Sequence, residues 1–310
     1  MNATSGRRTR ATSTPRAAVP ATTPDPDPRQ DLRYRGGRLI TDLTFTHFYL
    51  GGPGAWRPSD IANIDGALAA AMRDRGLENV MTQYFRRRPT CAFRPSRVLA
   101  GALASRFSTA DAVGLVRQLH ASGALGDHDL DSTLFDFILP SGTVLTDSSA
   151  PGRAWRAPRR GRGRGRHGVS DSLQGLGGYH GSVHVGDDTV YYTVCAYSEV
   201  LPDGRENGIV AFRRPWKNVV ATIYHELNEA RTDPDVDDVL RGGPARLLGW
   251  NSDTGDEAGD YALREADPLS RVFREVPLAG GRGKVPVQFM YSNAVHGPEG
   301  PRARPYPAFR

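Results

Sequence analysis

The chain has 310 residues, of which 38% are hydrophobic, and a formal net charge of +6 at pH 7. This content is sufficient for the core of one large domain or two small ones. No apolar run approaches the roughly 18 residues of a membrane-spanning helix, and the basic N-terminus lacks the apolar segment of a signal peptide. We therefore expect neither a membrane span nor a classical signal peptide.

The basic excess lies in two segments. Residues 1–38 hold eight Arg and three Asp, and residues 151–168 hold seven Arg and no acidic residue, so the rest of the chain is net negative. Neither segment shows hydrophobic periodicity, which predicts a disordered arm over 1–36 and a flexible Arg- and Gly-rich loop over 148–177. Because Arg–Gly chain can neutralise phosphates and stack on bases, a nucleic-acid-associated protein is one alternative.

The first predicted elements are a strand and several helical segments. Alternating apolar and polar residues predict a strand over Leu39–Leu50, closed by Gly-Gly-Pro. Apolar residues at intervals near three and four predict helix over Asp60–Arg86, in two pieces because a glycine interrupts the pattern. A further helix begins with an N-cap at Ser108 or Thr109 and stops at Gly123.

The second half predicts more strands and one long helix. We expect strands at Leu130–Gly142 and Ile209–Phe212, a hairpin within 181–198, a helix over Trp216–Ala230, and a last strand over Val285–Tyr291. Strands and helices are mixed without regular alternation. The expected fold class is therefore α+β, with a single mixed domain over 37–296 and a loose tail over 297–310.

The helix Trp216–Ala230 carries the sequence HELNE. His225 and Glu229 are spaced i and i+4, so they project from one face, and a metal ion can bridge such a pair. HExxH helices bind zinc in this way, and a carboxylate can replace the second imidazole. Glu226 would stand beside the metal, where it can take a proton from bound water. The solvated polar end of a helix would show the same pattern, so both interpretations stay open.

A third ligand could come from the acidic stretch Asp253–Asp260, in which Glu257 and Asp260 are three residues apart. This stretch could instead be a solvated loop or a calcium loop, although it lacks the spacing of an EF-hand. One histidine with two or three carboxylates is a harder donor set than the usual zinc site. Calcium and manganese are therefore alternatives to zinc.

Several short motifs occur in a fixed order along the chain. They are Gly178-Tyr179-His180-Gly181, His225-Glu226 with Glu229, Thr232-Asp233-Pro234, Gly249-Trp250, Glu257-x-Gly259-Asp260, Val287-Gln288 and Ser292-Asn293-Ala294. Together they resemble the HExxE, TDP, GW and ExGD pattern of the EXORDIUM-like, phosphate-induced proteins and their bacterial relatives. The resemblance spans roughly Gly37 to Ala294.

The resemblance implies a zincin-like core helix packed on a mixed sheet. It implies that His225 and Glu229 are metal ligands, that Glu226 is the general base, and that Glu257 or Asp260 is a further ligand or a neighbouring carboxylate. Members of the family are mostly exported, whereas this sequence shows no classical signal peptide. The plant members are associated with growth, and the bacterial members look like zinc-peptidase relatives.

We therefore expect a metal-dependent hydrolase, most simply a zinc metallopeptidase-like enzyme that acts on a peptide or protein. His180 is a further candidate ligand or a hydrogen-bonded core residue, and Tyr261 and His296 are candidate oxyanion donors. Cys91 and Cys195 could form a disulfide or remain two thiols. The alternatives are a non-catalytic extracellular or cell-surface binding protein of the EXORDIUM-like type and the nucleic-acid-associated protein.

Overall fold

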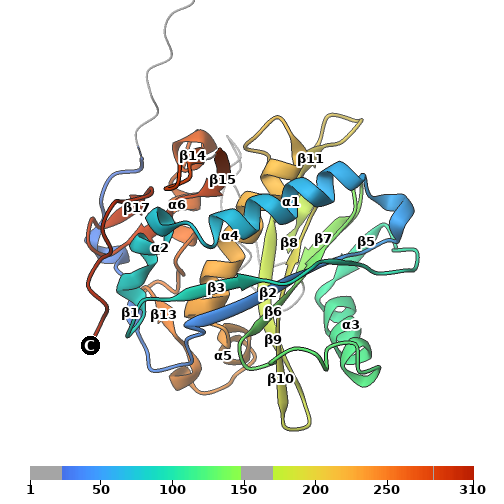
Figure 1. The fold of residues 1–310 in the computed structure, drawn as a ribbon, viewed down its shortest axis with the longest axis horizontal. Coiled ribbons are helices and arrows are strands. Elements are labelled where there is room, and N and C mark those ends of the chain that lie inside the picture. The colour runs from blue at the N-terminus through green and yellow to red at the C-terminus, as the bar shows by residue number, and fades with distance from the viewer. Residues whose placement is uncertain (1–22, 148–169, 282) are drawn as a thin grey trace, which may run out of the picture.

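The computed structural model describes residues 23–147, 170–281 and 283–310 (Figure 1). The Arg- and Gly-rich tract 151–168 and most of the N-terminal arm lie outside these ranges. The flexibility that the sequence predicts for both segments therefore stays a prediction. Among the described residues, no helix combines the length and apolar character needed to cross a membrane.

A six-stranded mixed sheet forms the centre of the fold (Figure 1). Its order is β3 (Thr90–Phe93), β2 (Asp42–Tyr49), β6 (Thr133–Ile138), β10 (Asp188–Cys195) and β9 (Gly178–Val185), with β4 (Arg97–Val98) also paired to β2. The pairs β3–β2, β2–β6 and β6–β10 are parallel, whereas β9 and β10 form an antiparallel hairpin. This confirms the predicted first strand and the predicted hairpin.

Helices cover both faces of this sheet. α1 (Pro58–Ala71) and α4 (Pro215–Thr232) pack on one face, and α3 (Thr109–Ala121) packs on the other. The N-cap of α3 is Ser108, whose hydroxyl accepts from the amide of Asp111 while the Asp111 carboxylate accepts from Ser108, a complete capping box. The α+β prediction therefore holds at the level of a mixed, domain-like fold.

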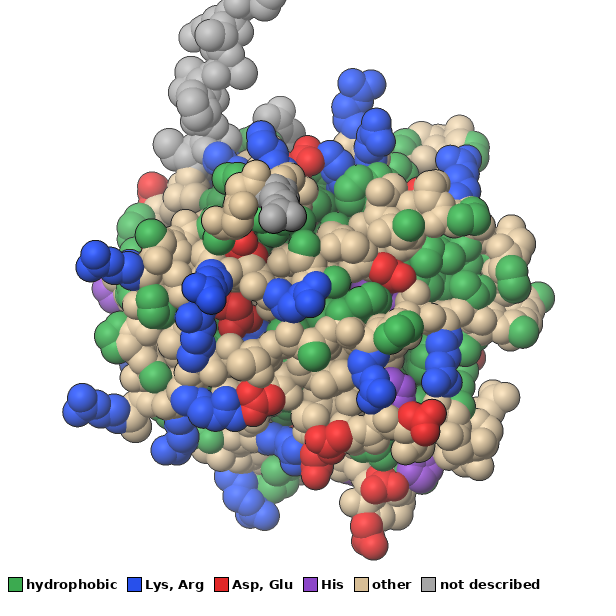
Figure 2. Space-filling model, viewed as in Figure 1, with side chains coloured by type: hydrophobic (Ala, Val, Ile, Leu, Met, Phe, Trp, Pro, Cys, Tyr) green, Lys and Arg blue, Asp and Glu red, His purple; other side chains and the backbone are tan. Residues whose placement is uncertain are grey.

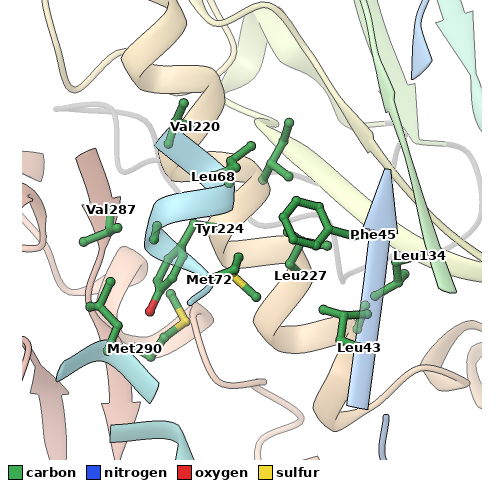
Figure 3. Close-up of a cluster of buried hydrophobic side chains, with 14 of the residues drawn as sticks. Leu43, Phe45, Leu68, Met72, Leu134, Val220, Tyr224, Leu227, Val287 and Met290 are labelled. Carbon is green, nitrogen blue, oxygen red and sulfur yellow. The ribbon is translucent and has the colours of Figure 1, made fainter. Parts of the chain in front are cut away.

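The largest core lies between the sheet, α1 and α4 (Figure 3). Leu43 and Phe45 point from β2 toward this core together with Leu134 of β6, because alternate residues of a strand share one face. Leu68 of α1 and Leu227 of α4 meet them from the helical side. Burial of each such side chain stabilises the fold by roughly 1.5–3 kcal/mol.

The helix α4 is buried along most of its length. Every residue from Asn218 to Thr232 is buried, because α4 contacts the sheet, α1 and the hairpin of β14 (Phe273–Pro277) and β15 (Lys284–Gln288). The helix begins at Pro215, which fits the first turn since its missing N–H has no partner there. Polar side chains in the middle of α4 must therefore find partners inside the protein.

Shorter elements complete the fold. The remaining helices are α2 (Arg75–Met81), α5 (Val236–Leu240) and α6 (Asp260–Arg264), with 3-10 turns at Pro28–Gln30, Pro53–Ala55, Thr82–Tyr84, Ser172–Gln174, Ala245–Leu247 and Leu269–Arg271. Small sheets pair β1 (Arg33–Tyr34) with β13 (Trp250–Asn251), β11 (Glu199–Val200) with β12 (Glu206–Asn207), β16 (Met290–Ser292) with β17 (Gly297–Glu299), and β7 (Val144–Asp147) with both β5 (Arg106–Ser108) and β8 (Ser170–Asp171).

Two predicted strands differ from the structure. Ile209–Phe212 is irregular, because the amides of Ala211 and Phe212 donate to Asn218 Oδ1 at 3.0 and 2.7 Å instead of to a strand. The predicted strand Val285–Tyr291 is divided between β15 and β16, which pair with different partners. In both places tertiary contacts override the local pattern.

Both ends of the described chain pack on the body. Residues 23–36, which the sequence assigned to the arm, include β1, and the C-terminal residues include β17. The ring of Phe309 lies 5.1 Å from the rings of both Tyr34 and Trp250. These aromatic contacts bury apolar side chains of both terminal segments, which the composition of those segments did not predict. Cys91 and Cys195 are free thiols on separate strands, so the two-thiol alternative holds.

One row across the sheet is polar. His47, Asp136, Thr193 and His180 are register partners on the adjacent strands β2, β6, β10 and β9. Thr193 Oγ1 donates to Asp136 Oδ1 at 2.7 Å, and His47 contacts Asp136 at 3.5 Å and Asp65 at 2.8 Å. The row ends at His180, so the sheet register places this histidine opposite α4.

The buried acid in this row predicts a pH-dependent stability. Burial raises the pKa of Asp136 to about 7, above the value of about 3.9 in unfolded chain. The contribution of its protonated form to folding is present below about pH 4 and is lost as the pH rises through 7. Relative to Asp136→Asn, the parent should therefore lose stability between pH 4 and 7.5 in urea unfolding. The exposed Asp187→Asn serves as the control, and a difference that does not change with pH would contradict the assignment.

Candidate functional site

The polar motif of α4 is inside the protein. His225, Glu226 and Glu229 are 6%, 5% and 3% exposed. Burial of three ionisable side chains costs several kcal/mol unless each is compensated. The interpretation of HELNE as a solvated helix end is therefore wrong.

The ring of His225 is held in one orientation by Gln288. Gln288 Nε2 donates to the carbonyl of Gly259 at 2.7 Å, so its Oε1 faces His225 Nδ1 at 3.0 Å as the acceptor. Nδ1 therefore carries the proton, and Nε2 points toward Glu229 Oε2 at 2.9 Å. An outer hydrogen bond that fixes the tautomer is typical of metal-binding histidines.

The carboxylates of Glu229 and Asp260 are also held in place by hydrogen bonds. Glu229 Oε1 accepts from the amide of Gly259 at 2.8 Å, and Asp260 Oδ2 accepts from the amide of Glu257 at 2.9 Å. Donor atoms of His225, Glu229 and Asp260 all lie within 4.8 Å of one another. One imidazole and two carboxylates thus converge at a spacing that a metal ion can bridge.

His180 reaches the same region from the opposite side. It projects from β9, and its Nδ1 lies 3.3 Å from Glu226 Oε2. Its Nε2 lies 3.5 Å from Glu257 Oε1 and 3.3 Å from the carbonyl of Asp233. Donor atoms of His180, Glu229 and Glu257 form a second group within 4.8 Å. The sequence could not decide between a core histidine and a ligand, and the geometry allows the ligand.

These side chains line a cavity of about 80 Å³, which has room for several water molecules. The described lining residues include no Lys or Arg. Its histidine and acidic residues are His180, His225, Asp147, Glu226, Glu229, Asp237, Glu257 and Asp260. The described lining residues therefore carry more acidic than basic side chains, a composition that favours a cation.

The histidines hold their protons tightly because of this charge. Burial alone would lower the pKa of His225, but Glu229, Glu226 and Asp260 outweigh it and raise the pKa to about 10. The pKa of His180 is raised well above its usual value, since Glu257 and Glu226 outweigh its burial. At neutral pH the two imidazolium charges therefore offset part of the negative charge, and a divalent cation would replace these protons on binding.

Two glycines let α4 approach its neighbours. A Cβ at Gly259 would overlap the His225 ring, and a Cβ at Gly178 would lie 3.1 Å from Glu226 Oε1. Both glycines belong to motifs that the sequence singled out, GYHG and ExGD. Their role is steric: only a residue without a side chain fits where the backbone touches the motif side chains.

The structure brings together most of the predicted site residues. Six of them surround the cavity: His180, His225, Glu226, Glu229, Glu257 and Asp260. The rest of the acidic stretch serves elsewhere, because Asp253 pairs with Arg35 and Asp256 pairs with Arg264.

The two candidate oxyanion donors, Tyr261 and His296, are not among the described residues that line the cavity. The hydroxyl of Tyr261 donates to the carbonyl of Asp25 at 2.9 Å. His296 pairs with Asp31 at 2.9 Å, also away from the cavity. Both residues hold the N-terminal segment against the body.

The sequence missed two residues that support the site. Gln288 orients His225; the sequence named it only within the Val287-Gln288 motif and gave it no role, although it is a polar residue within the apolar run Val285–Tyr291. Asp237 of α5 lines the cavity and forms an ion pair with Arg241 at 3.0 Å. Nothing in the spacing of residues points to Asp237, because α5 reaches the cavity only through the tertiary fold.

No family model, curated protein or solved structure matches this chain. The resemblance of its motifs to the EXORDIUM-like proteins therefore stays a prediction from the sequence. The function has to be inferred from the chemistry of the cavity.

The close contact at Gly259 predicts the effect of one added methyl group. In Gly259→Ala, the new Cβ would displace a His225 ring that Gln288 and Glu229 hold, so the free energy of unfolding should fall by about 1–3 kcal/mol. Gly114→Ala, in α3 with open space around it, should raise it by about 0.4–1 kcal/mol. Urea unfolding measures both, and equal effects would contradict the packing described.

Proposed function

We propose that this protein is a metal-dependent hydrolase of the zinc-peptidase type. His225, Glu229 and Asp260 would hold the metal, and Glu226 would act as the general base. The observation that carries this proposal is the convergence of Nε2 of His225 and two oriented carboxylates on one buried cavity. Three protein donors leave a coordination position for water, as in catalytic zinc sites.

Glu226 is in the position that a general base requires. Its Oε1 lies 4.0 Å from His225 Nε2, the nitrogen that faces the metal position, so the carboxylate stands beside the donor group. Its Oε2 lies 3.3 Å from His180 Nδ1, which orients it. A bound divalent ion lowers the pKa of its water and polarises a carbonyl. Glu226 would accept the proton of that water and return it to the leaving amine.

The donor types favour zinc but allow other metals. An imidazole nitrogen is a common zinc ligand, whereas calcium usually takes six to eight oxygen ligands. Manganese accepts the same mixture of imidazole and carboxylate. We propose zinc as the metal, with manganese and calcium as the alternatives, and a peptide or protein as the substrate.

The fold and the motifs add support. α4 packs against β9 and β10, which is the arrangement expected of a zincin-like core helix. The motifs that resemble those of EXORDIUM-like proteins gather around α4: the amide of Gly249 donates to Asp233 Oδ1 at 2.8 Å, and Gly259 contacts His225. A non-catalytic binding protein of the same family is the second candidate, and the deep burial of the donors favours it.

A nucleic-acid-associated function draws no support from the described surface in Figure 2. Lys and Arg side chains are spread over this face, with acidic side chains among them. Binding to phosphates is strongest where basic side chains gather. The Arg- and Gly-rich tract that suggested this function lies outside the described residues.

Metal analysis of the purified chain separates these functions. We expect at least one equivalent of zinc per chain in the parent, its loss in Glu229→Ala, and its retention in Glu226→Gln. In a peptidase screen, Glu226→Gln should lower kcat/KM by roughly 10²–10⁴-fold, because it removes the base but keeps the shape. The matched control is Glu275→Gln on the exposed side of β14, which should leave both readouts unchanged.

Metal retained without hydrolysis of any peptide substrate would favour the binding protein. A chain that holds no zinc, manganese or calcium after addition of each would overturn the metal site itself.

A further inference from the structure

The cavity contains two groups of metal-binding atoms that share Glu229. One is His225, Glu229 and Asp260, and the other is His180, Glu229 and Glu257. Within each group the donor atoms lie within 4.8 Å of one another. We propose that the protein binds two divalent metal ions, bridged by the Glu229 carboxylate. This inference rests on the proposed metal-dependent function and extends it to a two-metal hydrolase.

The two groups are built symmetrically about Glu229. His225 approaches from α4, and His180 approaches from β9 on the opposite side. Glu257 and Asp260 come from one turn, joined by the amide of Glu257 donating to Asp260 at 2.9 Å, yet each belongs to a different group. One short turn thus supplies a carboxylate to each ion.

Glu229 can bridge two ions while it keeps its hydrogen bond. Its Oε1 accepts one bond, from the amide of Gly259 at 2.8 Å, and its Oε2 faces His225 at 2.9 Å. Each carboxylate oxygen has two lone pairs, so Oε1 retains one for an ion. Carboxylate-rich sites of this kind hold two metals roughly 3.5–4 Å apart.

The charge of the donor residues is compatible with two ions. Glu226, Glu229, Glu257 and Asp260 are four carboxylates among the described lining residues, which include no Lys or Arg. With both histidines bound as neutral imidazoles, two divalent ions match the formal charge of these four carboxylates. Of the other two acids in the lining, Asp147 accepts from Thr109 at 3.1 Å and Asp237 pairs with Arg241 at 3.0 Å.

The contacts of His180 are also compatible with a metal ligand. Its Nδ1 lies 3.3 Å from Glu226 Oε2, and its Nε2 lies 3.5 Å from Glu257 Oε1. Without metal, a protonated imidazole can donate to both carboxylates. As a neutral ring with Nδ1 donating to Glu226, His180 would present its Nε2 lone pair toward Glu257, and a cation could bind between these two groups. A carboxylate behind the ligating histidine is a common arrangement at metal sites.

The test is metal stoichiometry on the full chain. The purified protein is stripped with a chelator and titrated with Mn²⁺ alone or with Zn²⁺ alone, and the bound ions are counted after equilibrium dialysis. We expect two equivalents in the parent and one in both His180→Ala and His225→Ala. We expect neither ion to be held tightly in Glu229→Ala. His184→Ala, an exposed histidine on the same strand β9, should keep two.

A spectroscopic readout makes the test independent of the folding of any variant. Two Mn²⁺ ions bridged by one carboxylate are magnetically coupled, so the parent loaded with two equivalents should give a coupled electron paramagnetic resonance spectrum. One equivalent in the parent, with an uncoupled spectrum and no change in His180→Ala, would overturn the two-metal centre and leave the proposed hydrolase standing. No bound metal at all would overturn both.

Discussion

The structure depends on one constraint: a helix that carries several ionisable side chains is buried in the core. Each His, Glu and Arg of the buried part of α4 has a partner that another segment supplies. Gln288 holds His225, the amide of Gly259 holds Glu229, and Arg231 is fully buried against Glu78 at 3.0 Å. Because a buried charge without a partner costs several kcal/mol, these contacts also determine how β15, α2 and the ExGD turn pack around α4.

The partners of α4 differ in charge between its two buried polar regions. The Arg231 guanidinium and Glu78 compensate each other within the chain. Around His225 and Glu229 the described cavity lining supplies acids and imidazoles but no Lys or Arg. A cation bound to these acids in the folded state but not in the unfolded state would raise the free energy of unfolding, so the proposed metal would contribute to the stability of this core.

The sequence predicted the local part of the site and missed the tertiary part. His225, Glu226 and Glu229 could be identified because one helix sets their spacing, and Glu257 and Asp260 because one short turn holds both. Tyr261 was misplaced because the short α6 directs it toward Asp25, which no periodicity reveals. Gln288 and the register that places His180 opposite α4 depend on strand pairing far along the chain. The strand expected at Ile209–Phe212 failed because one side chain, Asn218, captures its amides.

We propose that the cavity between β9 and α4 holds metal, with Nε2 of His225 and the Glu229 carboxylate as ligands. The most direct measurement is anomalous diffraction at the zinc absorption edge from crystals grown with zinc. We expect an anomalous peak in the cavity at about 2.0–2.2 Å from His225 Nε2 and from a Glu229 oxygen. Anomalous peaks only on the outer surface, with His225 and Glu229 still in direct contact, would contradict it.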